Sequence, residues 1–160
     1  MVVTMEALVR DTLAGVMDPE IPVCSITDLG IVERVAVTED VIAVTLLPTF
    51  SGCPALDAIR TDVERALIPI ADGRAVEVRY VFDPPWTTDR ITAAGREALR
   101  SFGISPPGRR MLELKVRCPN CGSLETVLES EFGPTPCRSI RYCTACRNPF
   151  EGFKPKIPEE

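Results

Sequence analysis

The chain of 160 residues contains no histidine. Without an imidazole, neither a Ser-His-Asp nor a Cys-His catalytic unit can form within the chain, which argues against the common hydrolase classes. Any bound metal must be held by cysteine, aspartate, glutamate or backbone groups, because these are the remaining ligands that the chain offers.

The sequence also lacks long apolar runs. Its apolar content is 45% and its mean hydropathy is +0.09, values that indicate a globular protein and exclude a disordered or membrane-spanning chain. The N-terminus shows no basic stretch, apolar run or small-residue cleavage site of a secretory signal. We therefore expect a cytoplasmic protein, without a membrane partner, whose cysteines stay reduced.

A large excess of basic residues is missing as well. Residues 1–108 carry a formal charge of −7 and residues 109–160 a charge of +2, which gives the net charge of −5. Proteins that bind nucleic acids generally need a basic footprint to displace counterions from phosphates. The charges thus favour a protein partner and no nucleic acid, and they leave the oligomeric state open, with a homodimer as one option.

Two Cys-x-x-Cys pairs near the C-terminus are the most informative feature that is present. They are Cys118/Cys121 and Cys143/Cys146. Each two-residue gap lets one tight turn direct two thiolates at one ion, and two such turns complete a tetrahedron of four sulfurs. Two disulfides would need an oxidising compartment. The spacing admits both zinc and an iron–sulfur centre, and we expect structural zinc because the paired turns are typical of a zinc ribbon.

The hydrophobic pattern predicts an α+β protein with a small αββαβα domain followed by a zinc-ribbon-like β domain. We expect the first domain over residues 1–105 and the second over residues 111–160, with a Gly- and Pro-containing linker at 103–110. The second part is small enough to need a metal as a staple. The expected elements are helices at 4–17, 54–67 and 89–102, a hairpin of 31–37 with 41–47, and a strand at 76–82.

Cys53 is the candidate functional side chain of the first domain. If the following helix begins at Pro54, the sulfur lies beside unpaired amides at the positive end of the helix dipole, which favours the thiolate. Glu20 and Asp28 lie in loops before the hairpin and would join Cys53 if these loops meet at one end of the sheet. Three such ligands would hold iron transiently. Two alternatives remain open: Cys53 as a core residue, and the carboxylates as helix and turn caps.

The two remaining cysteines give weaker signals. Cys24 follows Pro22-Val23, and we interpret it as an ordinary buried thiol. Cys137 lies six residues before Cys143 and is open to three interpretations: a fifth ligand, a redox partner or a core thiol.

Several motifs together resemble two known families. Asp18-Pro19-Glu20, Asp28-Leu29-Gly30-Ile31-Val32 and Gly52-Cys53-Pro54 resemble the iron–sulfur assembly domain of bacterial SufT proteins and of the eukaryotic cytosolic iron–sulfur targeting factors. The second half is similar to the PaaD (PaaJ) family, which accompanies the multicomponent phenylacetyl-CoA monooxygenase, or epoxidase, in aerobic phenylacetate degradation. The segments that carry this second resemblance are Asp83–Asp89, Cys118–Gly122, Ser130–Gly133, Cys137, Tyr142-Cys143 and Pro149–Lys154.

The resemblance implies an accessory protein, not an enzyme, that matures the metal sites of the oxygenase. It implies that Cys53 handles the cluster with Glu20 and Asp28 at the same site, and that the partners are the oxygenase subunits, foremost the Fe-S reductase component. The alternative is a structural or electron-transfer subunit of the oxygenase complex, with an Fe-S centre on the C-terminal cysteines. One departure from the family is Gly152, which stands where an aromatic residue is usual.

Overall fold

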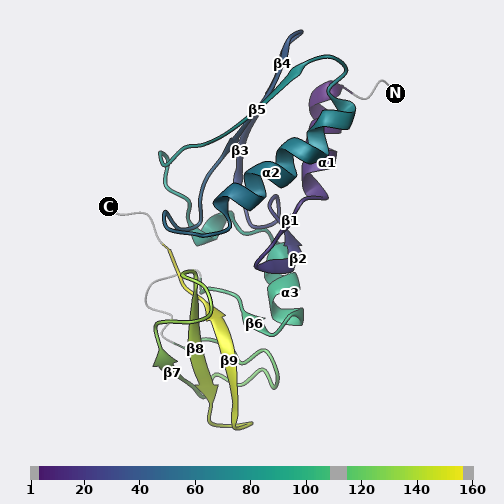
Figure 1. Ribbon diagram of the computed structural model, residues 1–160. Helices are drawn as coiled ribbons and strands as arrows, with labels where there is room; N and C mark the ends of the chain where they lie inside the picture. The colour runs from purple at the N-terminus through teal and green to yellow at the C-terminus, as the bar shows by residue number, and fades with distance from the viewer. Residues whose placement is uncertain (1–3, 109–114, 157–160) are drawn as a thin grey trace. The chain divides into compact units, whose positions relative to one another are not determined.

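The computed structural model describes residues 4–108 and 115–156. These residues form two compact units, one up to Trp86 and one from Thr87 onward, and the elements of both are labelled in Figure 1. Within the described residues, no helix is long and apolar enough to cross a membrane. The mixed α and β content agrees with the fold class that the sequence predicts.

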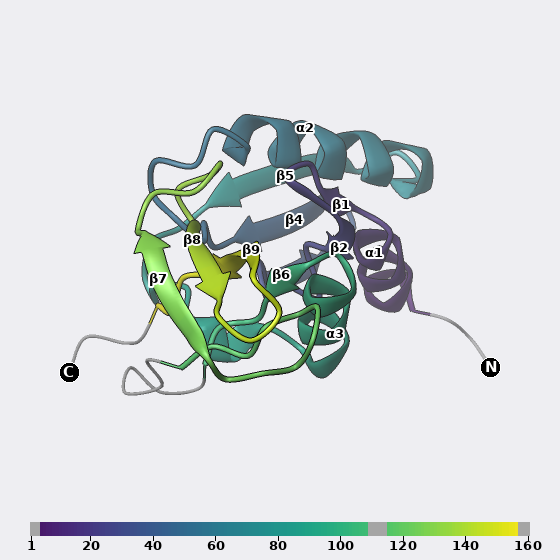
Figure 2. The same cartoon turned by 90° about the horizontal axis from the view of Figure 1, so that it is seen from below.

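The first unit is built on a three-stranded sheet with the order β3-β4-β5. Strands β3 (Val32–Val37) and β4 (Val41–Leu46) pair antiparallel, whereas β4 and β5 (Ala75–Tyr80) pair parallel. Helix α2 (Leu56–Leu67) connects the parallel strands and contacts β5, while α1 (Met5–Ala14) contacts α2 and β3. Figure 2 shows α2 running beside β5. A short 3₁₀ helix, η1 (Ile68–Ile70), follows α2.

The core residues of this unit repeat every second residue on the strands and every third or fourth residue on the helices. On β4, Ile42, Val44 and Leu46 are buried and lie two residues apart, so they share one face of the sheet. The buried residues of α2 recur every four residues, as expected for one helix face; they are Ile59, Val63 and Leu67. Helix α1 begins at the expected residue, because the Thr4 hydroxyl caps the backbone N–H of Ala7 at 3.2 Å.

Two local features of the first unit differ from the expectation. Helix α1 ends at Ala14 and not at 17, and residues 17–25 form a hairpin of β1 (Met17–Asp18) and β2 (Ile21–Ser25). Oδ1 of Asp18 accepts the backbone N–H groups of Glu20 at 2.8 Å and Ile21 at 3.0 Å and so closes the turn. Helix α2 begins at Leu56 and not at Pro54, because the preceding residues form turns in which Cys53 N–H bonds to Phe50 O at 3.1 Å.

Trp86 is the last residue of the first unit and is buried. It is the single tryptophan of the chain and is 1% exposed. Its indole N–H donates to the backbone oxygen of Leu29 over 2.9 Å, so a residue at the end of the unit is tied to the turn before β3. A buried indole normally needs such a polar partner.

The second unit holds a four-stranded sheet with the order β6-β9-β8-β7. A 3₁₀ helix, η2 (Thr88–Arg90), and α3 (Ala93–Ser101) precede β6 (Ile104–Ser105), which pairs parallel with β9 (Asn148–Phe153). Strands β7 (Thr126–Ser130) and β8 (Arg138–Cys143) complete the sheet, and β8 pairs antiparallel with both neighbours.

The segment after helix α3 also differs from the structure expected from the sequence. Helix α3 contacts β6, and Ile104 and Ser105 of β6 are buried, so part of the expected linker is a strand of the second sheet. Gly103 has φ = +89° and ends α3 as expected for a left-handed cap. Independent folding of residues 1–105 and 111–160 stays a prediction.

Candidate metal centre and the Cys53 turn

Four cysteines of the second unit converge at one end of its sheet. The sulfur atoms of Cys118, Cys121, Cys143 and Cys146 all lie within 4.8 Å of one another. Two of the separations are short, 3.8 Å between Cys118 and Cys146 and 3.6 Å between Cys121 and Cys143. Four thiolates placed about 2.3 Å from a tetrahedral zinc ion are about 3.8 Å apart. The residues therefore fit a four-coordinate metal, as their spacing predicts.

The two turns that present these sulfurs have the same backbone geometry. In the first, Gly122 N–H bonds to Cys118 O at 2.9 Å; in the second, Arg147 N–H bonds to Cys143 O at 2.8 Å. Gly122 has φ = +75° and Arg147 has φ = +59°. Each turn thus ends in a left-handed residue four positions after its first cysteine. Glycine meets this requirement without cost, whereas arginine bears some strain.

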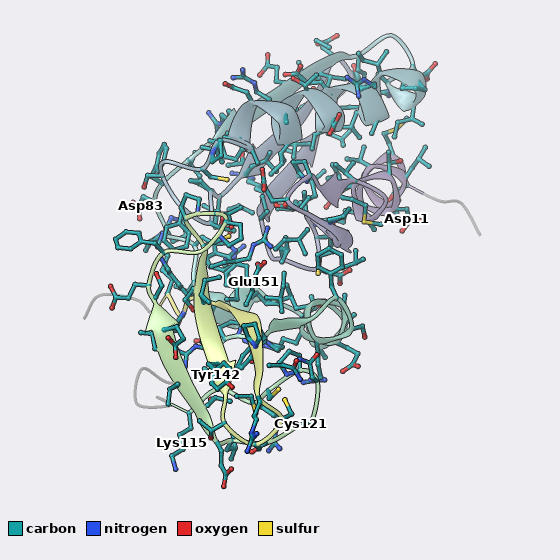
Figure 3. All side chains as sticks on the ribbon, turned by 60° about the horizontal axis from the view of Figure 1, so that its bottom comes forward. Asp11, Asp83, Lys115, Cys121, Tyr142 and Glu151 are labelled. Atoms are coloured by element: carbon teal, nitrogen blue, oxygen red, sulfur yellow. The ribbon has the colours of Figure 1, made fainter. Side chains whose placement is uncertain are left out.

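The metal ligands also form part of the apolar core of the second unit. Cys118 and Cys143 are 1% and 0% exposed, and they pack with Val116, Phe150 and the partly buried Cys146. Cys121 lies at the surface and is labelled at the tip of this unit in Figure 3. One side of the tetrahedron therefore faces hydrocarbon and the other faces solvent.

The four thiols change one another's pKa values. The Ser123 backbone N–H lowers the pKa of Cys121, yet partial loss of hydration at the sulfur and shared hydrogen bonds with the other three thiols outweigh it and raise this pKa to about 12. The side chain of Asn148 is the main cause that lowers the pKa of Cys146 to about 7. Four adjacent thiols cannot all ionise without a counter-charge, and a divalent metal supplies it.

Cys53 lies in the turn before α2, and its side chain is partly exposed. It stands three residues ahead of the first helical residue, Leu56, whose N–H reaches Cys53 O over 3.4 Å. The sequence places this sulfur at the helix start, and the structure places it one turn earlier. Strands β4 and β5 are parallel, so their C-terminal ends lie at the same edge of the sheet. The Cys53 turn follows β4 and the residues after Tyr80 follow β5, so both segments begin at this edge.

Tyr80 marks the surroundings of Cys53. Its hydroxyl donates to Leu56 O over 3.1 Å. Burial is the largest cause that raises the pKa of Tyr80, followed by the charges of Cys53 and Asp18. Asp18 is therefore a carboxylate whose field, like that of Cys53, reaches the Tyr80 hydroxyl. Asp18 is not among the site residues predicted from the sequence, although it begins the Asp18-Pro19-Glu20 motif.

Glu20 and Asp28, whose carboxylates were expected beside Cys53, both take part in hydrogen bonds of their own turns. Asp28 accepts the hydroxyl of Ser25 at 2.9 Å, and its N–H bonds to the same hydroxyl oxygen at 3.0 Å. Glu20 uses its backbone N–H in the Asp18 turn. In the described part of the chain, the only group of three or more potential metal ligands is the four-cysteine one. A joint role of Glu20, Asp28 and Cys53 stays a prediction.

The other two cysteines are core thiols. Cys24 is 0% exposed on β2. Cys137 is buried, lies 3.1 Å from the Thr135 hydroxyl and does not belong to the four-cysteine group. Cys53 is thus the cysteine outside that group whose side chain reaches solvent.

Comparison with known proteins finds two family models that match separate parts of the chain. Residues 105–154 match the "PaaD zinc beta ribbon domain" and residues 6–79 match the "Iron-sulfur cluster assembly protein" family. The chain is 43% identical over 147 residues to an Escherichia coli (strain K12) protein that is named as one component of the "Putative 1,2-phenylacetyl-CoA epoxidase". The match covers 89% of this chain and 88% of that protein. The chain belongs to the PaaD family.

Shorter relatives match part of the chain over nearly their whole length. The "Fe-S protein maturation auxiliary factor YitW" of Bacillus subtilis (strain 168) is 34% identical over 59% of this PaaD-family chain and 97% of its own length. The crystal structure of a domain of unknown function, DUF59, from Bacillus anthracis matches with a TM-score of 0.55 and 31% identity, covering 59% of this chain and 91% of that chain. The first part of the PaaD-family chain thus has a DUF59-like fold, as the resemblance implied.

Proposed function

We propose that this protein is an accessory maturation factor of a phenylacetyl-CoA epoxidase that delivers iron or an iron–sulfur unit to a component of that enzyme. Membership of the PaaD family and the maturation-factor names of the shorter relatives support this function. The observation that carries it is the position of Cys53: it lies within the iron–sulfur assembly match and is the cysteine outside the metal centre that reaches solvent.

The two units then have separate tasks. In this proposal the cargo binds at Cys53, and Glu20, Asp28 or Asp18 supplies oxygen ligands. The four-cysteine centre binds structural zinc and maintains the ribbon as a docking module. The recipient that we propose is the Fe-S reductase component. Neither task requires catalysis, which agrees with a chain that has no histidine.

Cluster transfer from the reconstituted protein tests the proposal. The purified chain is loaded anaerobically with iron and sulfide and mixed with the apo-form of the reductase, and the visible spectrum and reductase activity are followed. Cys53→Ser should abolish transfer, whereas the matched control Cys24→Ala, which removes a buried thiol elsewhere in the same unit, should retain it. Equal transfer by parent and Cys53→Ser would refute the role of Cys53.

The alternative, an electron-transfer subunit, is favoured by the same tetrahedral sulfur geometry, which suits iron as well as zinc. Elemental analysis of the protein purified from its native host separates the two functions. Zinc gives a colourless protein, and about one zinc per chain supports the maturation factor. Iron with visible absorption that persists in Cys53→Ser would place a redox centre on the ribbon cysteines.

A further inference from the structure

The three-stranded sheet of the first unit carries its helices on one face. Ile42, Val44 and Leu46 of β4 are buried on that face, and α1 contacts β3 while α2 contacts β5. Figure 1 shows both helices on the same side of the three strands. Because side chains alternate along a strand, Ala43 and Thr45 point to the other face. We call these two side chains, with their pairing partners on β3 and β5, the open face.

One row of side chains crosses the open face from edge to edge. Thr45 on the central strand pairs with Arg34 on β3 and with Arg79 on β5. Residues that pair on neighbouring strands point to the same face of a sheet. Neighbouring strands are about 4.8 Å apart, so the Cα atoms of the two arginines are about 9.6 Å apart. Two guanidinium groups therefore flank one hydroxyl group.

The polar groups of this row are free to bind a partner. Arg34 and Arg79 are exposed, and neither side chain makes an ion pair or a hydrogen bond with any residue of the ranges 4–108 and 115–156. The Thr45 side chain makes no hydrogen bond within the same ranges either. Each guanidinium has five N–H donors. The row thus offers two full positive charges and a hydroxyl to an acidic group.

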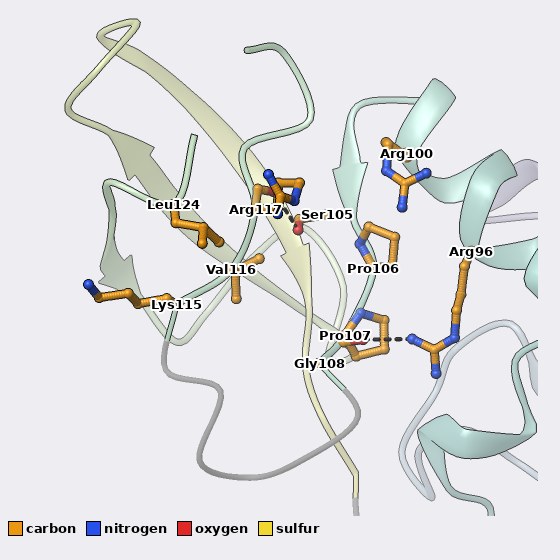
Figure 4. A pocket seen from close by; sticks show the side chains of 10 residues that line it. All are labelled: Arg96, Arg100, Ser105, Pro106, Pro107, Gly108, Lys115, Val116, Arg117 and Leu124. Atoms are coloured by element: carbon orange, nitrogen blue, oxygen red, sulfur yellow. Dashed lines mark hydrogen bonds between the residues drawn. The ribbon is translucent and has the colours of Figure 1, made fainter. Parts of the chain in front are cut away.

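Several other arginines of the chain are already engaged. Arg65 of α2 pairs with Asp62 at 2.8 Å. In the second unit, Arg96 donates to Pro107 O over 2.7 Å, which is one of the bonds drawn in Figure 4. The charge of Arg65 is therefore balanced on its own helix, whereas the charges of the open face are not balanced by an ion pair with any described residue.

The rest of the open face is flat and mostly apolar. The next row consists of Ala36, Ala43 and Glu77, and Val41 pairs with Ala75 in the row after that. Glu77 makes no ion pair with any residue that the structure describes. A sheet face that only meets water is usually polar, whereas the central strand here presents valine, alanine and threonine. Such a face is suited to a further packed layer.

From these features we infer that the open face docks an α-helix of a partner protein, and that this helix presents two carboxylates seven residues apart. Two residues seven positions apart lie on one side of a helix, about 10.5 Å apart along its axis. This spacing matches the roughly 9.6 Å between the arginine Cα atoms. Guanidinium groups bind carboxylates bidentately, and the alanine methyl groups let the helix lie close to the strands. A small anion fits less well, because small-molecule sites are concave.

The docked helix leaves the Cys53 turn uncovered. Tyr80 pairs with Leu46, and its hydroxyl donates to Leu56 O of α2, so it points to the face that the helices cover. The Cys53 turn leads into α2 on that side of the sheet. A partner on the open face therefore does not block Cys53. The inference does not rest on the cargo proposed for Cys53, and its test uses no iron.

A titration of the full, zinc-loaded chain with helical probe peptides tests the inference. The first probe is an alanine-rich peptide of about 20 residues, long enough to be helical in water, with two glutamates seven residues apart. The second has them nine residues apart, on opposite faces of the helix, and the third has glutamine at both positions. The first probe should bind one per chain and shift the backbone amide NMR signals of Arg34, Ala43, Thr45 and Arg79. Added salt should weaken this binding.

The probes should differ by the number of charge contacts that they make. The second probe reaches one arginine and should bind about fivefold more weakly than the first, the effect of losing one charge contact at about 4 Å in water. The variants Arg34→Gln and Arg79→Gln should each weaken the first probe by the same factor, and the double variant by about 25-fold if the two contacts are independent. Arg65→Gln is the matched control, because it removes one positive charge from α2 in the same unit. It should bind the first probe like the parent, and all variants should retain the parent's circular dichroism.

Several results would overturn the inference. Equal binding of the first two probes, or unchanged affinity in both open-face variants, would exclude the paired arginines as the docking site. An equal loss in Arg65→Gln would reduce the effect to net charge. Tighter binding of phosphate or of an unstructured hexaglutamate peptide would make the occupant a small anion or an extended acidic segment. Dimerisation of the chain that disappears in the double variant would make it a second copy. A lack of any amide shift with the first probe would also refute the inference.

Discussion

Removal of the metal should unfold the sheet of the second unit while the first unit stays folded. The apolar side chains packed around the sulfurs are few, with Val116 and Phe150 as the main ones. Burying a side chain of this size stabilises a fold by about 1.5–3 kcal/mol, so the two together contribute about 3–6 kcal/mol. Structural zinc contributes about 10–16 kcal/mol in zinc-finger peptides. The metal is therefore the larger stabilising term for β7, β8 and β9.

The single tryptophan makes this prediction measurable in the intact chain. Trp86 is buried and bonds to Leu29 O within the first unit, so its fluorescence reports on the folding of that unit. Titration with a strong chelator should abolish the β signal of the ribbon in far-ultraviolet circular dichroism and release one zinc, while the Trp86 emission maximum stays unchanged. Urea serves as the positive control that shifts the emission.

Two results would refute this reasoning. A red shift of Trp86 at the same chelator concentration would show that the units unfold together, against the division of the chain. A ribbon that keeps its circular dichroism after complete metal loss would show that the apolar core suffices without the ion. Hydrogen exchange of α3 under chelator would also tell whether residues up to 105 belong with the first domain, as the sequence predicts.

Three further predictions concern single residues. Tyr80→Phe should remove a loss of stability at high pH. The pKa of Tyr80 is raised in the folded protein, so folding stability is intact below about pH 10 and falls above it, where Tyr80 ionises in the unfolded chain first. Urea unfolding at pH 8 to 11 measures this difference, and an equal decline of stability in parent and variant would contradict the prediction. Gly122→Ala should destabilise the ribbon by about 1 kcal/mol, because residue 122 has a positive φ. Arg147→Gly should stabilise the ribbon by a similar amount, because Arg147 also has a positive φ. Thermal unfolding of the zinc-bound variants measures both effects, and Tm values equal to that of the parent would refute backbone strain at these positions. Gly133→Ala should destabilise the fold by about 1–3 kcal/mol, because the added Cβ would lie 2.8 Å from the Arg138 backbone. Gly52→Ala is the control and should leave stability unchanged, because no atom lies within 4 Å of its added Cβ. Unchanged stability of Gly133→Ala would refute the close contact.

The elements with a strong period could be predicted from the sequence. Helix α2 carries Ile59, Val63 and Leu67 on one face, and β3 and β4 appear as two β-rich runs around a polar turn. The convergence of the four cysteines could be predicted because two Cys-x-x-Cys gaps are typical of one shared metal site. In each case one local physical rule is enough.

Features that depend on contacts between distant residues were missed. Strand β6 has two residues, too short for any period, and it exists because β9 pairs with it from about fifty positions further along the chain. The hairpin of β1 and β2 depends on the Asp18 carboxylate capping its own turn, which a Pro-containing segment conceals. The start of α2 shifted because turn hydrogen bonds around Cys53 outweighed the preference of Pro54 for a first helical turn.

The double use of Cys118 and Cys143, as metal ligands and as interior residues of the ribbon, constrains how this sequence can change over generations. A mutation at either position removes a bond to the ion and opens a gap among the packed side chains at once, so no neutral intermediate connects a metal-dependent ribbon to a metal-free one. The ligand set should therefore be inherited as a block, even where the outer strand β7 and its exposed side chains diverge freely.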